Sequence, residues 1–165
     1  MTIWALSPTS NPAVLRLDAS LELTQETIET CPPSTAPRPL DRLLEIAQIR
    51  SIDLHRYRAR LNLVPGSDLD AITLQVCELL AEEWGPSSSK RDGPARTFPV
   101  PYRGPRLVAE SLRMAGQQPL LRALFDVPGV VEAILEPGHV RVRLGRLFSW
   151  TELEERVRAV LEPGG

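Results

Sequence analysis

The clearest chemical signal in the sequence is a set of arginines that recur at every second position in two short segments. The residues between them are apolar, so a strand in either segment would have one apolar face and one arginine-rich face. Arginine suits paired hydrogen bonds to carboxylates and phosphates, so such a face fits an acidic protein or a nucleic acid. The candidate partner-binding residues are Arg56, Arg58, Arg60, Arg141 and Arg143. The competing interpretation is a solvated sheet face.

Other reactive side chains follow no catalytic or metal-binding pattern. Cys31 and Cys77 lie far apart in the sequence, and neither His55 nor His139 has a partner at ligand spacing. We find no Gly-rich phosphate loop and no ordered Ser-His-Asp set. The sequence therefore predicts no catalytic, cofactor-binding or metal-binding residues and no enzyme. A catalytic site assembled from distant positions stays open as an alternative.

Composition narrows the class of protein further. The chain has 165 residues, 42% of them hydrophobic, which is enough for one good core or two small ones. Its net charge of −2 gives no global signature of nucleic-acid binding. The N-terminus lacks a signal-peptide pattern, and no apolar stretch is long enough to span a membrane. We expect a cytoplasmic protein without a membrane partner. A disulfide between the two cysteines is the less favoured interpretation in that compartment.

The elements that would position these arginines occur twice. Residues 39–80 and residues 119–161 share one order: amphipathic helix, strand, turn, alternating strand, turn, amphipathic helix. The predicted fold class is α+β, with two tandem two-layer modules, each a mainly antiparallel sheet with helices on one face. We place the first module at 1–86, a linker at 87–96 and the second module at 97–165.

Local signals give further expectations for the second module. Apolar spacing predicts a helix over residues 107–115. Ser149 with Glu152 three residues later predicts a capping box at the start of the last helix. The proline-rich segment 98–105 is unsuited to a central strand and fits an edge strand or an extended crossing.

Two segments resemble a known family. Residues 119–130 (PLLRALFDVPGV) resemble the SPLAKALFAIDGV signature in the N-terminal domain of Nfu/NifU-type iron–sulphur scaffold proteins. Residues 9–17 (TSNPAVLRL) are similar to that family's Thr-Pro-Asn-Pro opening, with Ser10 in place of the first proline. The resemblance implies a two-layer α+β sandwich and a role in iron–sulphur cluster assembly or delivery.

One departure limits what the resemblance implies. The family's scaffolds bind their cluster through a Cys-x-x-Cys motif in a separate C-terminal domain, and this sequence contains no such motif. We therefore expect a non-catalytic protein-interaction module that binds a protein partner, such as a component of the iron–sulphur assembly machinery, and not the cluster. The alternatives are a nucleic-acid-binding accessory protein that uses the arginine-rich face and an uncharacterised enzyme.

Overall fold

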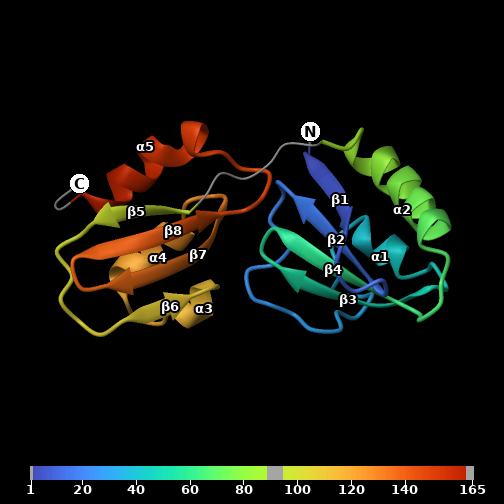
Figure 1. Cartoon of the computed structure of the whole chain (residues 1–165), viewed down its shortest axis with the longest axis horizontal. Coiled ribbons are helices and arrows are strands. Elements are labelled where there is room, and N and C mark those ends of the chain that lie inside the picture. Colours follow the sequence, from blue (N-terminus) through green and yellow to red (C-terminus); the bar gives the residue numbers. More distant parts are fainter. Residues whose placement is uncertain (1, 89–94, 163–165) are drawn as a thin grey trace. The chain divides into compact units, whose positions relative to one another are not determined.

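The chain divides into two units, Met1–Ser89 and Lys90–Gly165 (Figure 1). The computed structural model describes residues 2–88 and 95–162. The division falls inside the expected linker, and residues 89–94 of that linker lie outside the described residues. Ordered structure reaches into both ends of it. The amide of Ser88 donates to the carbonyl of Trp4 over 2.7 Å, and a strand begins at Arg96.

The first module contains one four-stranded antiparallel sheet and two helices. The strand order is β1-β2-β4-β3, so β2 and β4 are the inner strands. The elements are β1 (Trp4–Pro8), β2 (Val14–Ala19), α1 (Leu40–Leu43), β3 (Ile49–His55), β4 (Arg58–Leu63) and α2 (Leu69–Trp84).

The second module contains a similar sheet with the order β5-β8-β7-β6, also antiparallel. Its elements are β5 (Arg96–Pro99), β6 (Leu107–Ala109), α3 (Leu112–Ala115), α4 (Pro119–Phe125), β7 (Val130–Glu136), β8 (His139–Leu144) and α5 (Trp150–Leu161). The proline-rich segment 98–105 therefore begins in an edge strand, β5, which is one of the two forms expected for it.

The helix expected over residues 107–115 is wrong. The segment begins as β6, in which Val108 pairs with Ile134 of β7. Only its end is helical, where the hydroxyl of Ser111 accepts from the amide of Met114 and caps α3. Pairing with a distant strand outweighs the local helical spacing, because propensity is a weak prior when tertiary contacts are available.

The two modules share their central hairpin in detail. Val130 lies 81 positions after Ile49, and each begins the first strand of its hairpin. The ladder shifts register at the same place in both, between Ile49 and Ser51 and between Val130 and Glu132. In the second module β6 pairs with the outer side of β7. In the first module an isolated bridge between Ile28 and Leu54 lies on the corresponding side of β3. The expected pair of α+β modules with antiparallel sheets is confirmed.

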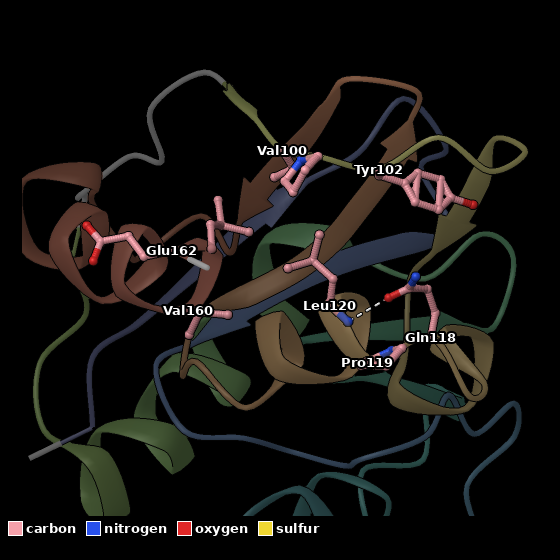
Figure 2. Close-up of a pocket in the computed structure, with 9 residues that line it drawn as sticks. Val100, Tyr102, Gln118, Pro119, Leu120, Val160 and Glu162 are labelled. Atoms are coloured by element: carbon pink, nitrogen blue, oxygen red, sulfur yellow. Dashed lines mark hydrogen bonds between the residues drawn. The ribbon is translucent and has the colours of Figure 1, made fainter. Parts of the chain in front are cut away.

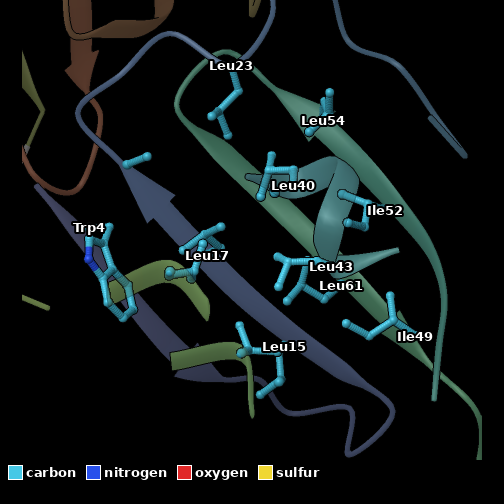
Figure 3. Packing of buried hydrophobic residues seen from close by; sticks show 14 of the residues in the cluster. Trp4, Leu15, Leu17, Leu23, Leu40, Leu43, Ile49, Ile52, Leu54 and Leu61 are labelled. Atoms are coloured by element: carbon cyan, nitrogen blue, oxygen red, sulfur yellow. The ribbon is translucent and has the colours of Figure 1, made fainter. Parts of the chain in front are cut away.

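One face of each sheet is buried under the helices. In the first module the inward residues of all four strands meet the apolar stripes of α1 and α2 in a single cluster. Figure 3 shows Leu40 and Leu43 of α1 among the strand residues of this cluster. In the second module α4 and α5 supply Leu121, Leu124, Phe125, Trp150, Leu153 and Val157 to the equivalent cluster. Alternation in the strands and 3–4 spacing in the helices therefore produce the two layers that the sequence predicts.

The long helices begin in different ways. The carboxylate of Asp68 accepts from the amide of Ala71 over 3.2 Å and caps α2. Ser149 lies at the matching position before α5, but its side chain makes no capping hydrogen bond. The capping box expected from Ser149 and Glu152 is therefore wrong. The amides of Glu152 and Leu153 donate to the backbone carbonyl of Ser149.

Gly129, in the turn before β7, offers a test of this packing. Its φ is +106°, and an added Cβ would lie 2.7 Å from Phe148 Cδ1 and 2.8 Å from Leu153 Cδ1. We expect Gly129→Ala to destabilise the second module by about 2–4 kcal/mol, from backbone strain and overpacking together. Gly138→Ala is the matched control: its φ is +87° but the space around it is open, so strain alone should cost about 1 kcal/mol.

Urea titration followed by amide NMR signals of each module measures both effects, with the first module as an internal reference. Equal losses for the two variants would contradict the role of Phe148 and Leu153.

Candidate functional site

The face of each sheet opposite the helices carries most of the predicted arginines. In the first module this face contains Arg16 and Asp18 of β2, Arg58, Arg60 and Asn62 of β4, and Ser51, Asp53 and His55 of β3. In the second module it contains Arg141 and Arg143 of β8 with His139, and Glu132, Ile134 and Glu136 of β7. We call these the first and second open faces. Both carry acidic as well as basic residues.

Arg58 is held by a buried carboxylate. Its Nε lies 3.0 Å from Asp18 Oδ1, and Arg16 Nε lies 3.3 Å from Asp18 Oδ2. Asp18 is only 1% exposed, because the two arginines flank it on the sheet. The charge on Arg58 is therefore already compensated within the module.

Arg56 does not belong to the open face. The hairpin reverses at Arg56 and Tyr57, so β4 begins only at Arg58. Arg56 Nε lies 2.8 Å from Glu22 Oε2, its guanidinium lies 5.2 Å from the Tyr57 ring centre, and its side chain is 13% exposed. The prediction that Arg56 shares a face with Arg58 and Arg60 is wrong, because Arg56 lies in the turn before β4.

Asp53 is the centre of a polar network on the first open face. Its Oδ1 accepts from the amide of Thr30 over 2.9 Å, and its Oδ2 accepts from Asn62 Nδ2 over 3.0 Å. Partial burial raises the pKa of Asp53, but these hydrogen bonds and the charges of Arg60 and His55 outweigh it, so the pKa lies below its ordinary value. The carboxylate is therefore ionised at neutral pH.

The second open face has its own ion pairs. Arg143 Nε lies 3.5 Å from Glu132 Oε1, and His139 Nε2 lies 2.7 Å from Glu136 Oε2. Arg106 Nε contacts the other oxygen of Glu136 at 2.8 Å. Hydrogen bonds from Arg106 and His139 lower the pKa of the Glu136 carboxyl. As in the first module, acidic residues compensate most of the basic charge.

Two predicted arginines stand apart from these pairs. Arg60 and Arg141 are both exposed, and neither forms an ion pair with any residue that the structure describes. They occupy equivalent positions, since each is the third residue of the second hairpin strand. Arg60 lies opposite Asp53, whose pKa its charge lowers, whereas Arg141 lies opposite Ile134. The hairpins thus present one exposed arginine outside any ion pair at the middle of each open face. A continuous patch that joins the arginines of both modules stays a prediction.

Sequence reasoning missed the acidic members of these faces. Asp18 follows the alternation Leu15, Arg16, Leu17, so the strand pattern alone placed it beside Arg16. What the sequence lacked was the register that brings Asp18 opposite Arg58. Glu132 and Glu136 became partners of Arg143 and His139 in the same way.

The remaining candidate groups lie elsewhere. Both cysteines are free thiols; Cys31 is buried in the first core, and burial raises the pKa of the half-buried Cys77 thiol. Over residues 2–88 and 95–162 no three His, Cys, Asp or Glu side chains gather as metal ligands would. Within the same ranges no helix combines the length and apolarity needed to cross a bilayer.

The Asp53 network predicts an acid-sensitive first module. A carboxyl whose folded-state pKa is depressed stabilises the fold above its unfolded-state pKa, and this contribution is lost as the pH falls through the folded-state value. We expect Asp53→Asn to cost about 1 kcal/mol at pH 7 and to weaken the dependence of stability on pH below about 4. Urea titrations at pH 7, 5 and 3 measure this, with Glu78→Gln on the exposed side of α2 as the control. If the free energy of unfolding of Asp53→Asn falls with decreasing pH as much as that of the wild type, the role of the network is contradicted.

Comparisons with protein-family models, with curated proteins and with solved structures found no match for this chain. The resemblance to the Nfu/NifU N-terminal domain therefore stays a prediction from the residues quoted above.

Proposed function

We propose that the chain is a non-catalytic pair of protein-interaction modules that binds an acidic segment of a partner protein through its open faces. The observation that carries this proposal is the repetition of one exposed arginine outside any ion pair at equivalent positions, Arg60 and Arg141. An arginine outside any ion pair can offer its full set of donors to a carboxylate.

The surroundings of these two arginines favour a protein over a nucleic acid. Nucleic-acid affinity depends on neutralising several phosphates at once. On the open faces Asp18, Asp53, Glu132 and Glu136 would repel a phosphate backbone. A protein surface can instead place a carboxylate beside each of these arginines and basic groups beside the acids, which gives complementarity and specificity.

The resemblance to Nfu/NifU scaffolds supports an iron–sulphur setting for this interaction. In that proposal the chain acts in the cytoplasm as an accessory to cluster assembly or delivery and binds an assembly protein without holding the cluster. The nucleic-acid-binding accessory and the uncharacterised enzyme remain the alternatives.

Charge reversal at the two arginines tests the proposal. The double variant Arg60→Glu with Arg141→Glu should bind the partner at least tenfold more weakly, because each new carboxylate repels the acidic segment, and a tenfold loss corresponds to about 1.4 kcal/mol. Folding should change by under about 0.5 kcal/mol per exposed site. The partner is isolated by pull-down from the source organism and its affinity for each purified variant is measured by calorimetry at fixed salt.

The control variant is Arg38→Glu with Arg156→Glu, which changes net charge equally at exposed positions away from the open faces. Full affinity in the Arg60 and Arg141 variant would overturn the proposal. Salt-dependent retention of the wild type on DNA or RNA, lost in the same variant, would favour the nucleic-acid alternative. Anaerobic reconstitution that yields a stable cluster on Cys31 or Cys77 would overturn the non-ligating role.

A further inference from the structure

A pocket of about 330 Å³ opens on the helix side of the second module (Figure 2). Three segments line it: the chain that follows β5 at Val100–Tyr102, the start of α4 at Gln118–Leu120, and the end of α5 at Val160–Glu162. Most of its walls are apolar. The side chain of Gln118 accepts from the amide of Leu120, which satisfies one of the first amides of α4 at the pocket wall.

The first module contains the same three walls. The amide of Ala19 donates to the carbonyl of Tyr57, as that of Val100 donates to Gly138, so the chain after β2 matches the chain after β5. The start of α1 matches the start of α4, and α2 follows its hairpin at the same interval as α5. The pocket therefore has a structural equivalent inside the first module.

In the first module Trp4 lies at this equivalent place, because it pairs with Ala19 and its Nε1 donates to the carbonyl of Gly85 at the end of α2. Helix α2 continues for one turn more than α5, over 16 residues against 12, and its last residue Trp84 is 7% exposed. Trp84 extends the buried stripe of Ile72, Val76 and Leu80, and Trp4 is buried opposite Ala19. Leu40 and Leu80 are completely buried as a result, whereas their counterparts Leu120 and Leu161 are only half-buried.

The neighbouring strand edge is closed to an added strand. In the first module the outward amide of Ser20 donates to Ile3, and β1 pairs along β2. The positions equivalent to Asp18 and Ser20 in the second module are Pro99 and Pro101, which have no amide hydrogen. A ligand of the second module can therefore reach the pocket with a side chain but cannot extend the sheet in the way that β1 does.

We propose that this pocket binds an indole-sized aromatic side chain of a partner protein. We infer the occupant from the first module, in which Trp4 lies between Ala19 and the end of α2, where Trp84 is also buried. The size is sufficient, since a dry apolar cavity of about 150 Å³ already accepts a benzene ring. The pocket lies on the side of the sheet opposite Arg141, so it is independent of the proposed arginine contacts.

The test uses the whole chain and a short blocked peptide, acetyl-Gly-Trp-Gly-amide, with acetyl-Gly-Ala-Gly-amide as the negative probe. In an NMR titration the tryptophan peptide should shift the amide signals of Tyr102, Leu120 and Leu161 saturably at millimolar concentration, and the alanine peptide should shift none of them. A single buried side chain yields only weak binding, because its burial must offset the entropy lost on association.

Val160→Trp should fill the pocket from α5, abolish the peptide-induced shifts and raise the thermal midpoint of the second module. Leu120→Ala is the second variant, and it should weaken peptide binding at least fivefold while circular dichroism reports an intact fold. The matched control is Met114→Ala, which removes an exposed apolar side chain of the same module and should leave peptide binding unchanged.

The proposal is overturned if the tryptophan peptide produces no saturable shift or if the Leu120→Ala variant keeps full affinity. Binding of free indole without binding of the tryptophan peptide would also overturn it, since the occupant would then be a small molecule.

Discussion

The burial of one face of a short antiparallel hairpin is the constraint on which the rest of this structure depends. In β4 the residues Ala59, Leu61 and Leu63 point away from water, and in β8 the residues Val140, Val142 and Leu144 do the same. A sheet of this size can bury that face only against helices, so the amphipathic helices before and after each hairpin must pack on the same side. The opposite face is then left to polar residues, and this is what places the arginines in water.

The chemistry of the open faces follows from how neighbouring strands are paired. Cross-strand neighbours lie within reach of one another, so an arginine opposite an acidic residue can form an ion pair. Arg58 and Arg143 form such pairs. Arg60 lies opposite Asp53 and lowers its pKa without forming an ion pair, and Arg141 lies opposite the apolar Ile134. The arginine-rich faces are therefore mixed in charge, with one exposed arginine outside the ion pairs at the middle of each. That arrangement favours recognition of a specific carboxylate over general attraction to a polyanion.

The two modules differ in how the edge of each sheet is protected from pairing with another strand. The first adds β1 beside β2 and extends α2 to Trp84, so both its edge and the end of its core are closed. The second has prolines along the outer side of β5 and a helix that ends at Leu161, so its edge is blunted but its core ends in a pocket. Prolines and added strands are both known ways to protect an edge from pairing. Strand β5 supplies Phe98 to its core, but the chain that follows β5 at Val100–Tyr102 has no strand such as β1 beside it to supply a second aromatic side chain in the way that β1 supplies Trp4.

The sequence by itself determined the features that depend on neighbours a few positions away. The alternation of β4 and β8, the apolar stripes of α2 and α5 and the Pro137–Gly138 turn were sufficient for the α+β class and the two-module division, because period and turn chemistry are local properties. The tertiary structure decided what depends on distant partners. It turned residues 107–109 into β6, since β7 offered an edge to pair with, and it placed Arg56 in a turn. It also set the register that pairs Asp18 with Arg58, and it formed the pocket beside Val160–Glu162. Register, ion pairing and pocket shape depend on contacts between segments tens of residues apart in the sequence. A local sequence pattern does not specify which distant segments come into contact.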